Sequence, residues 1–156
     1  MSLSNLNIRN QKGFTLAELT VATVIIMILT TASVTGFGRF VDYSRTHVLH
    51  NMILKDFPDA IKTYVAKKGS TTGYDKANLI LVTGIRDRGP WEDLWTTSIP
   101  DAVGEVTITI PLVNSDRYAT ILTETVTFVT ASQSKNISSI WYDAPTKSIK
   151  FKIPAV

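Results

Sequence analysis

The N-terminal part of the chain is a long apolar run with one acidic residue at its start. Residues 19–38 contain no charged side chain. A helix rises about 1.5 Å per residue, so this stretch spans roughly 30 Å, the thickness of one hydrocarbon core. Glu18 stands directly before the run. The pattern predicts a membrane-spanning helix over residues 14–38, and an ionisable residue at such a place indicates a function that needs a cationic partner.

After residue 38 the apolar positions recur at intervals of three and four, with charged residues between them. This spacing predicts an amphipathic helix over residues 39–67 whose apolar face packs against a sheet. Pro58 lacks a backbone donor and should kink or restart the helix, with Asp56 as the candidate cap. The apolar positions are Val41, Val48, Leu49, Met52, Ile53, Phe57, Ala60, Ile61 and Tyr64.

A connecting loop is expected over residues 68–94, after the glycine-containing segment 69–73. Within it, residues 75–82 can form a short helix that Asp75 caps and Gly84 ends. The hydrophobic period then changes, and β-branched and aromatic residues predict a sheet over 95–156. Residues 117–124 fit either a short helix or an extended loop. The predicted strands are 95–99, 106–110, 125–131, 137–142 and 148–153.

These elements together predict an α+β fold, in which a long N-terminal helical spine packs on an antiparallel β-sheet. In the last strand, Ile149, Phe151 and Ile153 alternate with polar residues, so one face should be buried and the other exposed to water. The chain length of 156 residues leaves room for one globular head over residues 39–156 beyond the membrane segment.

Charge and cysteine content narrow the functional classes. The formal charge is +3, and loss of the two basic residues Arg9 and Lys12 would leave +1, without a clustered basic face of the kind that binds nucleic acid. The chain contains no cysteine, which excludes thiol catalysis and cysteine metal sites. Small exported domains often depend on disulfides. Here the C-terminal part must instead be held by strand pairing, core packing or subunit contacts.

The segment GFTLAE begins at Gly13, follows the basic residues Arg9 and Lys12, and opens the apolar run. This arrangement resembles the prepilin leader of type IV pilins and their pseudopilin relatives. In that family a short basic leader ends in Gly, the next residue is usually Phe, and Glu stands fifth after the cut. Gly13, Phe14 and Glu18 occupy these places. The resemblance covers about the first 40 residues and implies a pilin fold.

The resemblance implies that residues 1–13 are a leader removed by a prepilin peptidase, and that Phe14 becomes an N-methylated N-terminus. It also implies polymerisation from the inner membrane, on a pilus assembly platform, into a helical homopolymer that reaches the cell surface. Cleavage creates an α-amino group at Phe14, a cation at neutral pH. In a staggered bundle this amine can pair with Glu18 of a neighbouring subunit.

Other interpretations of the apolar segment are a secretory signal peptide and an ordinary membrane anchor. A signal peptide has an apolar core of about 7–15 residues and a small-residue cleavage site, and this run is longer and lacks such a site. Within the family, the Gly- and Trp-containing segment 73–95 followed by strands resembles the type IVb pilins. The alternatives are a pseudopilin of a type II secretion system and a membrane-tethered binding module that does not polymerise.

Further chemistry is sparse, and we expect a structural protein with no enzymatic activity, cofactor or metal. His47 and His50 lie three residues apart without a third ligand nearby, so two surface histidines are expected. Major pseudopilins bind calcium, but the Gly expected after Pro90-Trp91 is Glu92 here, and their C-terminal acidic loop is missing. A sequon occurs at residues 136–138, a triplet that is common by chance.

Overall fold

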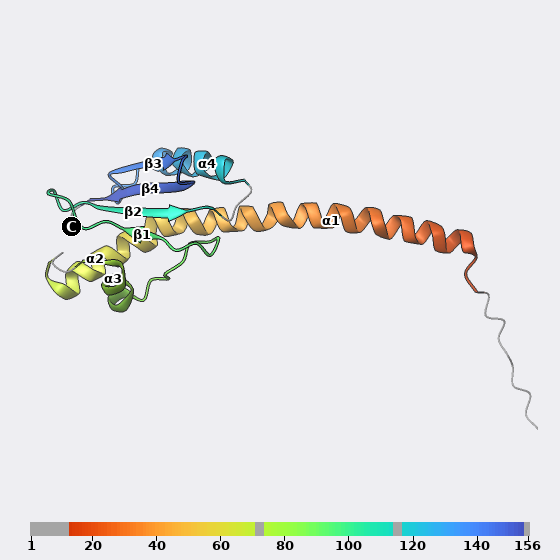
Figure 1. The fold of residues 1–156 in the computed structure, drawn as a ribbon, viewed down its shortest axis with the longest axis horizontal. Helices are drawn as coiled ribbons and strands as arrows, with labels where there is room; N and C mark the ends of the chain where they lie inside the picture. Colours follow the sequence, from red (N-terminus) through yellow and green to blue (C-terminus); the bar gives the residue numbers. More distant parts are fainter. Residues whose placement is uncertain (1–12, 71–73, 114–116, 155–156) are drawn as a thin grey trace, which may run out of the picture. The chain divides into compact units, whose positions relative to one another are not determined.

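The computed structural model describes residues 13–70, 74–113 and 117–154. The chain divides into two compact units, Met1–Val41 and Asp42–Val156, and each is described by itself. A long helix begins in the first unit and ends in the second, which also contains shorter helices and an antiparallel sheet (Figure 1). The predicted α+β architecture is confirmed.

Three consecutive helical segments form the spine: α1 (Leu16–Asn51), the π-helical segment η1 (Met52–Asp56) and α2 (Phe57–Lys68). In η1 the backbone hydrogen bonds reach back five residues, as from the N–H of Phe57 to the carbonyl of Met52. Pro58 lies in the first turn of α2, where its missing N–H costs little. The prediction that Asp56 caps a new helix is wrong. Because the π turn keeps the chain helical, Asp56 has helical backbone angles and its side chain caps no N–H.

One face of this helical series supplies the centre of the hydrophobic core of the second unit. Leu49, Ile53 and Phe57 are completely buried. The ring of Phe57 packs edge-on against Trp95 at 5.0 Å and against Phe151 at 5.7 Å between centroids. Burying a large apolar side chain of this kind contributes about 1.5–3 kcal/mol. Spine, connecting segment and sheet therefore meet in a single core.

The predicted apolar face is confirmed along most of its length and fails at Val48, which is 44% exposed. Val48 precedes the buried Leu49 by one residue, and one residue is about 100° around a helix. Val48 therefore points away from the core.

The sheet has four strands in the order β1-β2-β4-β3, and all neighbours are antiparallel. Ile108 on β2 lies opposite Phe151 on β4, and Ile140 on β3 lies opposite Phe151 on the other side. Strands are thus present at four of the predicted places, although the first contains only two residues. Their bounds are β1 Thr96–Thr97, β2 Val106–Pro111, β3 Ser139–Asp143 and β4 Ser148–Ile153.

The alternation predicted for the last strand is confirmed from Ile149 to Ile153 and fails at Ser148, which is buried; the lysines of its polar face form ion pairs. Lys150 lies 2.6 Å from Asp143, and Lys152 lies 3.1 Å from Asp101 and 3.2 Å from Glu105. The hydrogen bond from Lys152 holds the pKa of Asp101 below its usual value. These side chains are partly exposed to water, so the ion pairs are expected to add only a little stability.

Residues 125–131 were expected to form a strand, and this prediction is wrong. They are the second half of helix α4 (Tyr118–Ala131), which settles the open interpretation of residues 117–124 in favour of a helix. The helix buries Ile121, Leu122, Thr125 and Val129, a spacing of three and four that belongs to a helix rather than a strand. The β-branched residues of this segment favour a strand by intrinsic propensity, but burial of one helix face contributes more and decides for a helix.

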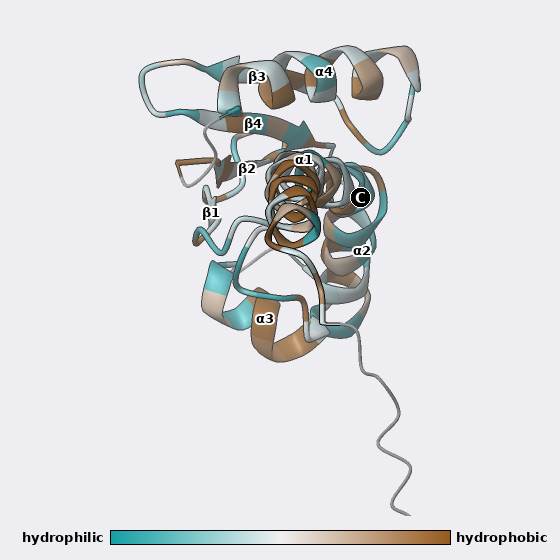
Figure 2. Ribbon diagram, turned by 90° about the vertical axis from the view of Figure 1, so that its right-hand side faces the viewer, coloured by the Kyte–Doolittle hydropathy of each residue, from teal (hydrophilic) through white to brown (hydrophobic). Residues whose placement is uncertain are grey.

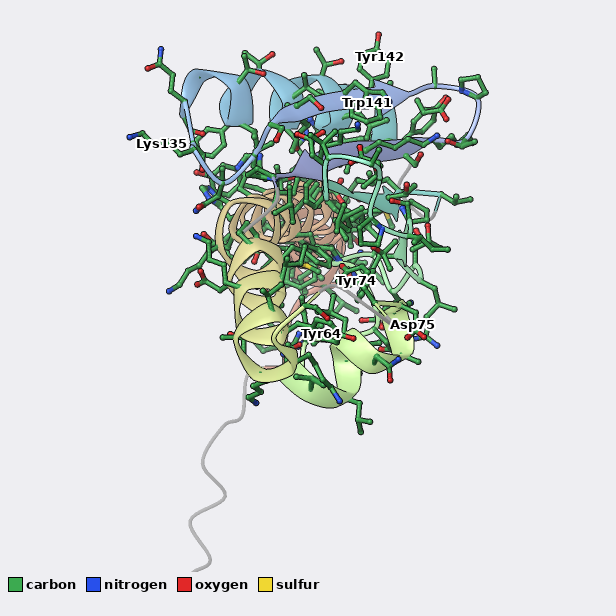
Figure 3. All side chains as sticks on the ribbon, turned by 90° about the vertical axis from the view of Figure 1, so that its left-hand side faces the viewer. Tyr64, Tyr74, Asp75, Lys135, Trp141 and Tyr142 are labelled. Atoms are coloured by element: carbon green, nitrogen blue, oxygen red, sulfur yellow. The ribbon has the colours of Figure 1, made fainter. Side chains whose placement is uncertain are left out.

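The connecting segment contains helix α3 (Lys76–Thr83), close to the predicted 75–82. Asp75 caps it by accepting a hydrogen bond from the N–H of Asn78, and Gly84 ends it with a φ of 72°, a left-handed conformation that favours glycine. Tyr74, just before the helix, packs edge-on against Tyr64 of α2 at 5.5 Å (Figure 3). Both predicted helix-end signals are confirmed.

The expectation of two surface histidines holds for His47 and fails for His50. His50, on α1, faces α4. Its ring stacks on that of Phe128 with 4.2 Å between centroids, and its Nε2 lies 3.2 Å from the buried hydroxyl of Thr125. Its Nδ1 is buried without a hydrogen-bond partner among the described residues. Burial lowers the pKa of His50, and the nearby His47 lowers it further, whereas Glu124 acts in the opposite direction.

This burial predicts a pH-dependent head. Because the pKa of His50 is lowered on folding from about 6.5, the unfolded chain binds the extra proton more readily. The free energy of unfolding of a fragment of residues 39–156 should therefore fall as the pH drops below about 6.5. Chemical denaturation of wild type and His50→Gln at a series of pH values measures this.

The His50→Gln fragment should lose this pH dependence, while His47→Gln should keep most of it. An equal pH dependence in wild type and His50→Gln between pH 7.5 and 5.5 would contradict the assignment.

Candidate functional site

The candidate site is the N-terminal end of α1, where all three residues singled out in the sequence lie. Gly13 and Phe14 precede the helix in an irregular, exposed segment. A Cβ placed on Gly13 would meet no atom within 4 Å. Nothing in the described part of the chain therefore obstructs the Gly13–Phe14 peptide bond.

Glu18 is held by a partner that the sequence analysis missed. Its Oε2 accepts hydrogen bonds from the backbone N–H of Thr15 at 2.8 Å and from the Thr15 hydroxyl at 3.0 Å. In return, the Glu18 N–H donates to Thr15 Oγ1 at 3.2 Å. This reciprocal arrangement is a capping box, which satisfies free N–H groups at the start of a helix. The T-x-x-E spacing before an apolar run is its sequence signal.

The capping box fixes the carboxylate at the helix N-terminus and uses only one of its two oxygens. Oε1 accepts no hydrogen bond from any described residue. A carboxylate can accept bonds at both oxygens. Glu18 is therefore held in place by its own chain and retains an acceptor for a cation from outside.

Beyond Glu18 the helix is almost continuously apolar, as the brown of its ribbon in Figure 2 shows, and its large side chains are exposed. It is long and apolar enough to cross a membrane, and its most apolar window is not buried by the described part of the chain. This lack of burial distinguishes it from the core helix of a globular protein. The exposed large side chains are Leu19, Val21, Val24, Ile25, Ile26, Met27, Ile28, Leu29, Val34 and Phe37.

The hydroxyl groups in this apolar stretch are all engaged where the structure describes them. Thr20, Thr23 and Thr30 each donate to the carbonyl four residues earlier, at 2.8 Å. Thr31 and Ser33 do the same at 2.9 and 2.7 Å. An unsatisfied polar group is costly in hydrocarbon. In the described part of this stretch these hydroxyls are therefore satisfied, whereas the charge of Glu18 still lacks an opposite charge.

The other candidate chemistry in the sequence does not assemble into a site. Among the described residues, no three His, Asp or Glu side chains group to hold a metal. Trp91 and Trp95 are buried in the core, and the indole N–H of Trp95 donates to the carbonyl of Arg86 at 2.6 Å. Asn136 of the sequon accepts a hydrogen bond from Lys62 at 2.9 Å.

Residues 8–34 match the model of the prokaryotic N-terminal methylation motif. The match contains Gly13, Phe14 and Glu18, together with residues 8–12 before them and much of the apolar helix after them. No curated protein and no solved structure matches the chain. The motif supports a type IV pilin-like or pseudopilin subunit, a structural class of protein, anchored in the membrane by its apolar N-terminal helix.

The capping box predicts that the hydroxyl of Thr15 stabilises the start of α1. Thr15→Val keeps the shape of the side chain but removes its hydroxyl, so the first turn of α1 should be weakened by about 1 kcal/mol. Thr15→Ser retains the hydroxyl and should behave as wild type. Amide hydrogen exchange of residues 16–19 in detergent micelles measures the loss. Equal protection in all three proteins would show that the capping box does not hold the helix start.

Proposed function

We propose that this chain is a structural subunit of a type IV pilus-like filament, made as a prepilin and polymerised through its N-terminal helix. The observation that supports it best is the helix start itself. A methylation motif, an accessible Gly13–Phe14 bond and a single held carboxylate precede an apolar helix that the described chain leaves uncovered.

The first step in this proposal is maturation at the cytoplasmic face of the membrane. Hydrolysis of the Gly13–Phe14 bond by a prepilin peptidase removes residues 1–13 and frees an α-amino group, which is then N-methylated. Gly13 suits this step because it has no side chain to keep a protease from the backbone. The basic residues of the leader hold the N-terminus in the cytoplasm. The mature helix then carries a cation at Phe14 and an anion at Glu18.

The second step is assembly into the filament. The Phe14 amine of an incoming subunit pairs with Glu18 of its neighbour, and Oε1 is the acceptor that the capping box leaves available. In an apolar bundle each of these charges is unfavourable without the other. The pair therefore sets the stagger between subunits. The apolar surface of α1 supplies the contact area, and residues 39–156 form the head of the filament.

Within this class we favour a type IVb-like pilin on the surface of the cell. The support is the Gly- and Trp-containing segment before the sheet, in which Trp91 and Trp95 anchor the loop in the core. A pseudopilin carries the same N-terminal motif and polymerises below the outer membrane. The two are distinguished by electron microscopy, because long surface fibres at natural expression levels identify the pilin and fibres only on overexpression identify the pseudopilin.

Maturation is the step that tests this proposal most simply. The wild-type protein in sheared fibres should begin with N-methylated Phe14 by mass spectrometry. Gly13→Val places a branched side chain at the cut, so full-length protein should accumulate in the membrane and surface fibres should disappear. Assembled protein that begins at Met1 or Ser2, or normal fibres from Gly13→Val, would refute the proposal.

A further inference from the structure

Helix α4 meets the spine at His50, within an otherwise apolar contact. The Nε2 atom of His50 lies 3.2 Å from the hydroxyl of Thr125, a completely buried residue, and the imidazole stacks on Phe128 with an angle of 10° between the ring planes. We call these three residues the α4 latch. The other buried side chains of this helix are apolar: Ile121, Leu122 and Val129.

The neutral form of His50 fits the α4 latch, and the protonated form does not. A neutral imidazole carries one N–H and one bare nitrogen, so Nε2 can either donate to the Thr125 hydroxyl or accept from it. The cation carries an N–H on both nitrogens. Its Nδ1 is buried without a hydrogen-bond partner among the described residues. Protonation therefore buries a charged donor that has no acceptor there, which is unfavourable.

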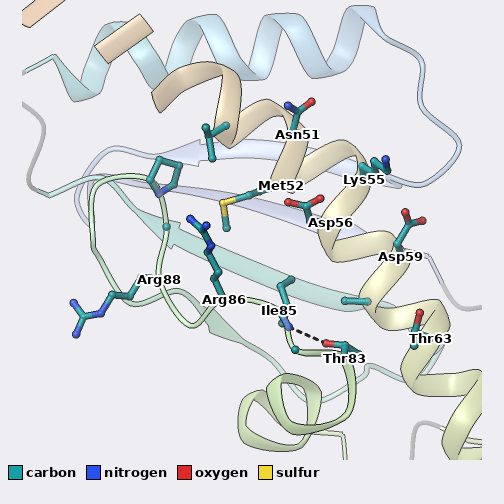
Figure 4. A pocket seen from close by; sticks show the side chains of 15 residues that line it. Asn51, Met52, Lys55, Asp56, Asp59, Thr63, Thr83, Ile85, Arg86 and Arg88 are labelled. Atoms are coloured by element: carbon teal, nitrogen blue, oxygen red, sulfur yellow. Dashed lines mark hydrogen bonds between the residues drawn. The ribbon is translucent and has the colours of Figure 1, made fainter. Parts of the chain in front are cut away.

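The titratable groups that act on His50 do not compensate for this burial. On its own helix, His47 lies 6.1 Å away between ring centroids and opposes a second positive charge. On α4, Glu124 favours the charge, but burial and His47 both act more strongly against it. The next charged residues of the spine, Lys55 and Asp56, instead line a groove of about 790 Å³ (Figure 4).

We infer that His50 acts as a pH-sensitive switch, in which protonation of its ring loosens α4 from the spine while the sheet stays folded. The buried apolar residues of α4 hold the helix at every pH, so acid raises the population of a minor open state. Strand β4 is paired with β2 on one side and with β3 on the other, which keeps the sheet together without α4. The inference concerns the head alone and does not depend on the proposed function.

Docking of α4 and protonation of His50 oppose each other. When α4 is open, the imidazole is in water and has an ordinary pKa near 6.5, whereas docking lowers the pKa through burial. The open state therefore binds the proton more readily, and its population rises as the pH falls below about 6.5. A single proton changes this equilibrium by at most about tenfold for each pH unit.

Hydrogen exchange of the full-length protein in detergent micelles tests the switch, with mass spectrometry of peptides from α4 and from β4. Protection factors, corrected for the intrinsic exchange rate at each pH, should be lower in α4 than in β4. Between pH 6.5 and 5.0 those of α4 should fall by up to about tenfold for each pH unit. Equal protection of α4 and β4 at every pH would overturn the inference, because α4 would then open only when the whole head unfolds.

Two matched variants assign the effect to one ring. His50→Gln keeps a side chain that can bond Thr125 but cannot be protonated in this pH range, so α4 protection should become nearly independent of pH. His47→Gln, at an exposed position one turn earlier, should keep most of the fall. The same fall in His50→Gln as in wild type would overturn the inference.

Glu124→Gln provides a test that leaves His50 in place. Glu124 favours the charged imidazole, so its removal lowers the pKa of docked His50 further. The loss of α4 protection between pH 7.5 and 5.0 should therefore be at least as large as in wild type. A clearly smaller loss would contradict the switch.

Discussion

One carboxylate at the start of an apolar helix is the constraint on which the account of this protein depends. A charge that enters a hydrocarbon or an apolar bundle must find a partner. The structure shows how Glu18 is supported in the single subunit, through the N–H and the hydroxyl of Thr15. These donors are neutral, so they orient the carboxylate without cancelling its charge. A cation is still needed, and cleavage after Gly13 would provide one.

The apolar side chains of the long helix are exposed in the first unit and buried along one face in the second. In the first unit its apolar residues are exposed and its hydroxyls bond to its own backbone, which suits a lipid or helix-bundle environment. In the second unit one face of the spine, from Leu49 through Phe57 to Tyr64, is buried in a hydrophobic core that the sheet also forms. The π-helical turn lies within this buried stretch. There the spine continues into Pro58 without a break in the helix.

Much of the fold could be predicted from the sequence because the strongest signals are local. The run without charge, the Asp75 and Gly84 helix ends and the alternation around Phe151 each depend on a few neighbouring residues. The π turn could not be predicted, since it depends on how the spine accommodates packing and Pro58 together. Residues 125–131 alternate like a strand and also carry helical spacing, and only contact with the spine through His50 and Thr125 decides between the two.

The sequence predicted which residues form the candidate site but not the hydrogen bonds between them. Gly13, Phe14 and Glu18 stand out by spacing alone, whereas the role of Thr15 depends on hydrogen bonds for which the T-x-x-E pattern is the sequence signal. The groove between residues 48–63 and 83–90 could not be found beforehand, because it is made by segments far apart in the sequence. The burial of His50 against α4 could not be found either, because a strand was expected over the second half of this helix.

The most direct test separates the charge of Glu18 from its role in the capping box. Glu18→Gln keeps an N3 side chain that can bond the Thr15 N–H but removes the charge, while Glu18→Asp keeps the charge and shortens the reach. The measurement is the yield of sheared fibres relative to processed protein in the membrane, with each variant as the sole subunit. The account predicts normal processing throughout, an intermediate yield from Glu18→Asp, and loss of fibres from both Glu18→Gln and Glu18→Val. A normal fibre yield from Glu18→Val would contradict the pairing of this carboxylate with the Phe14 amine.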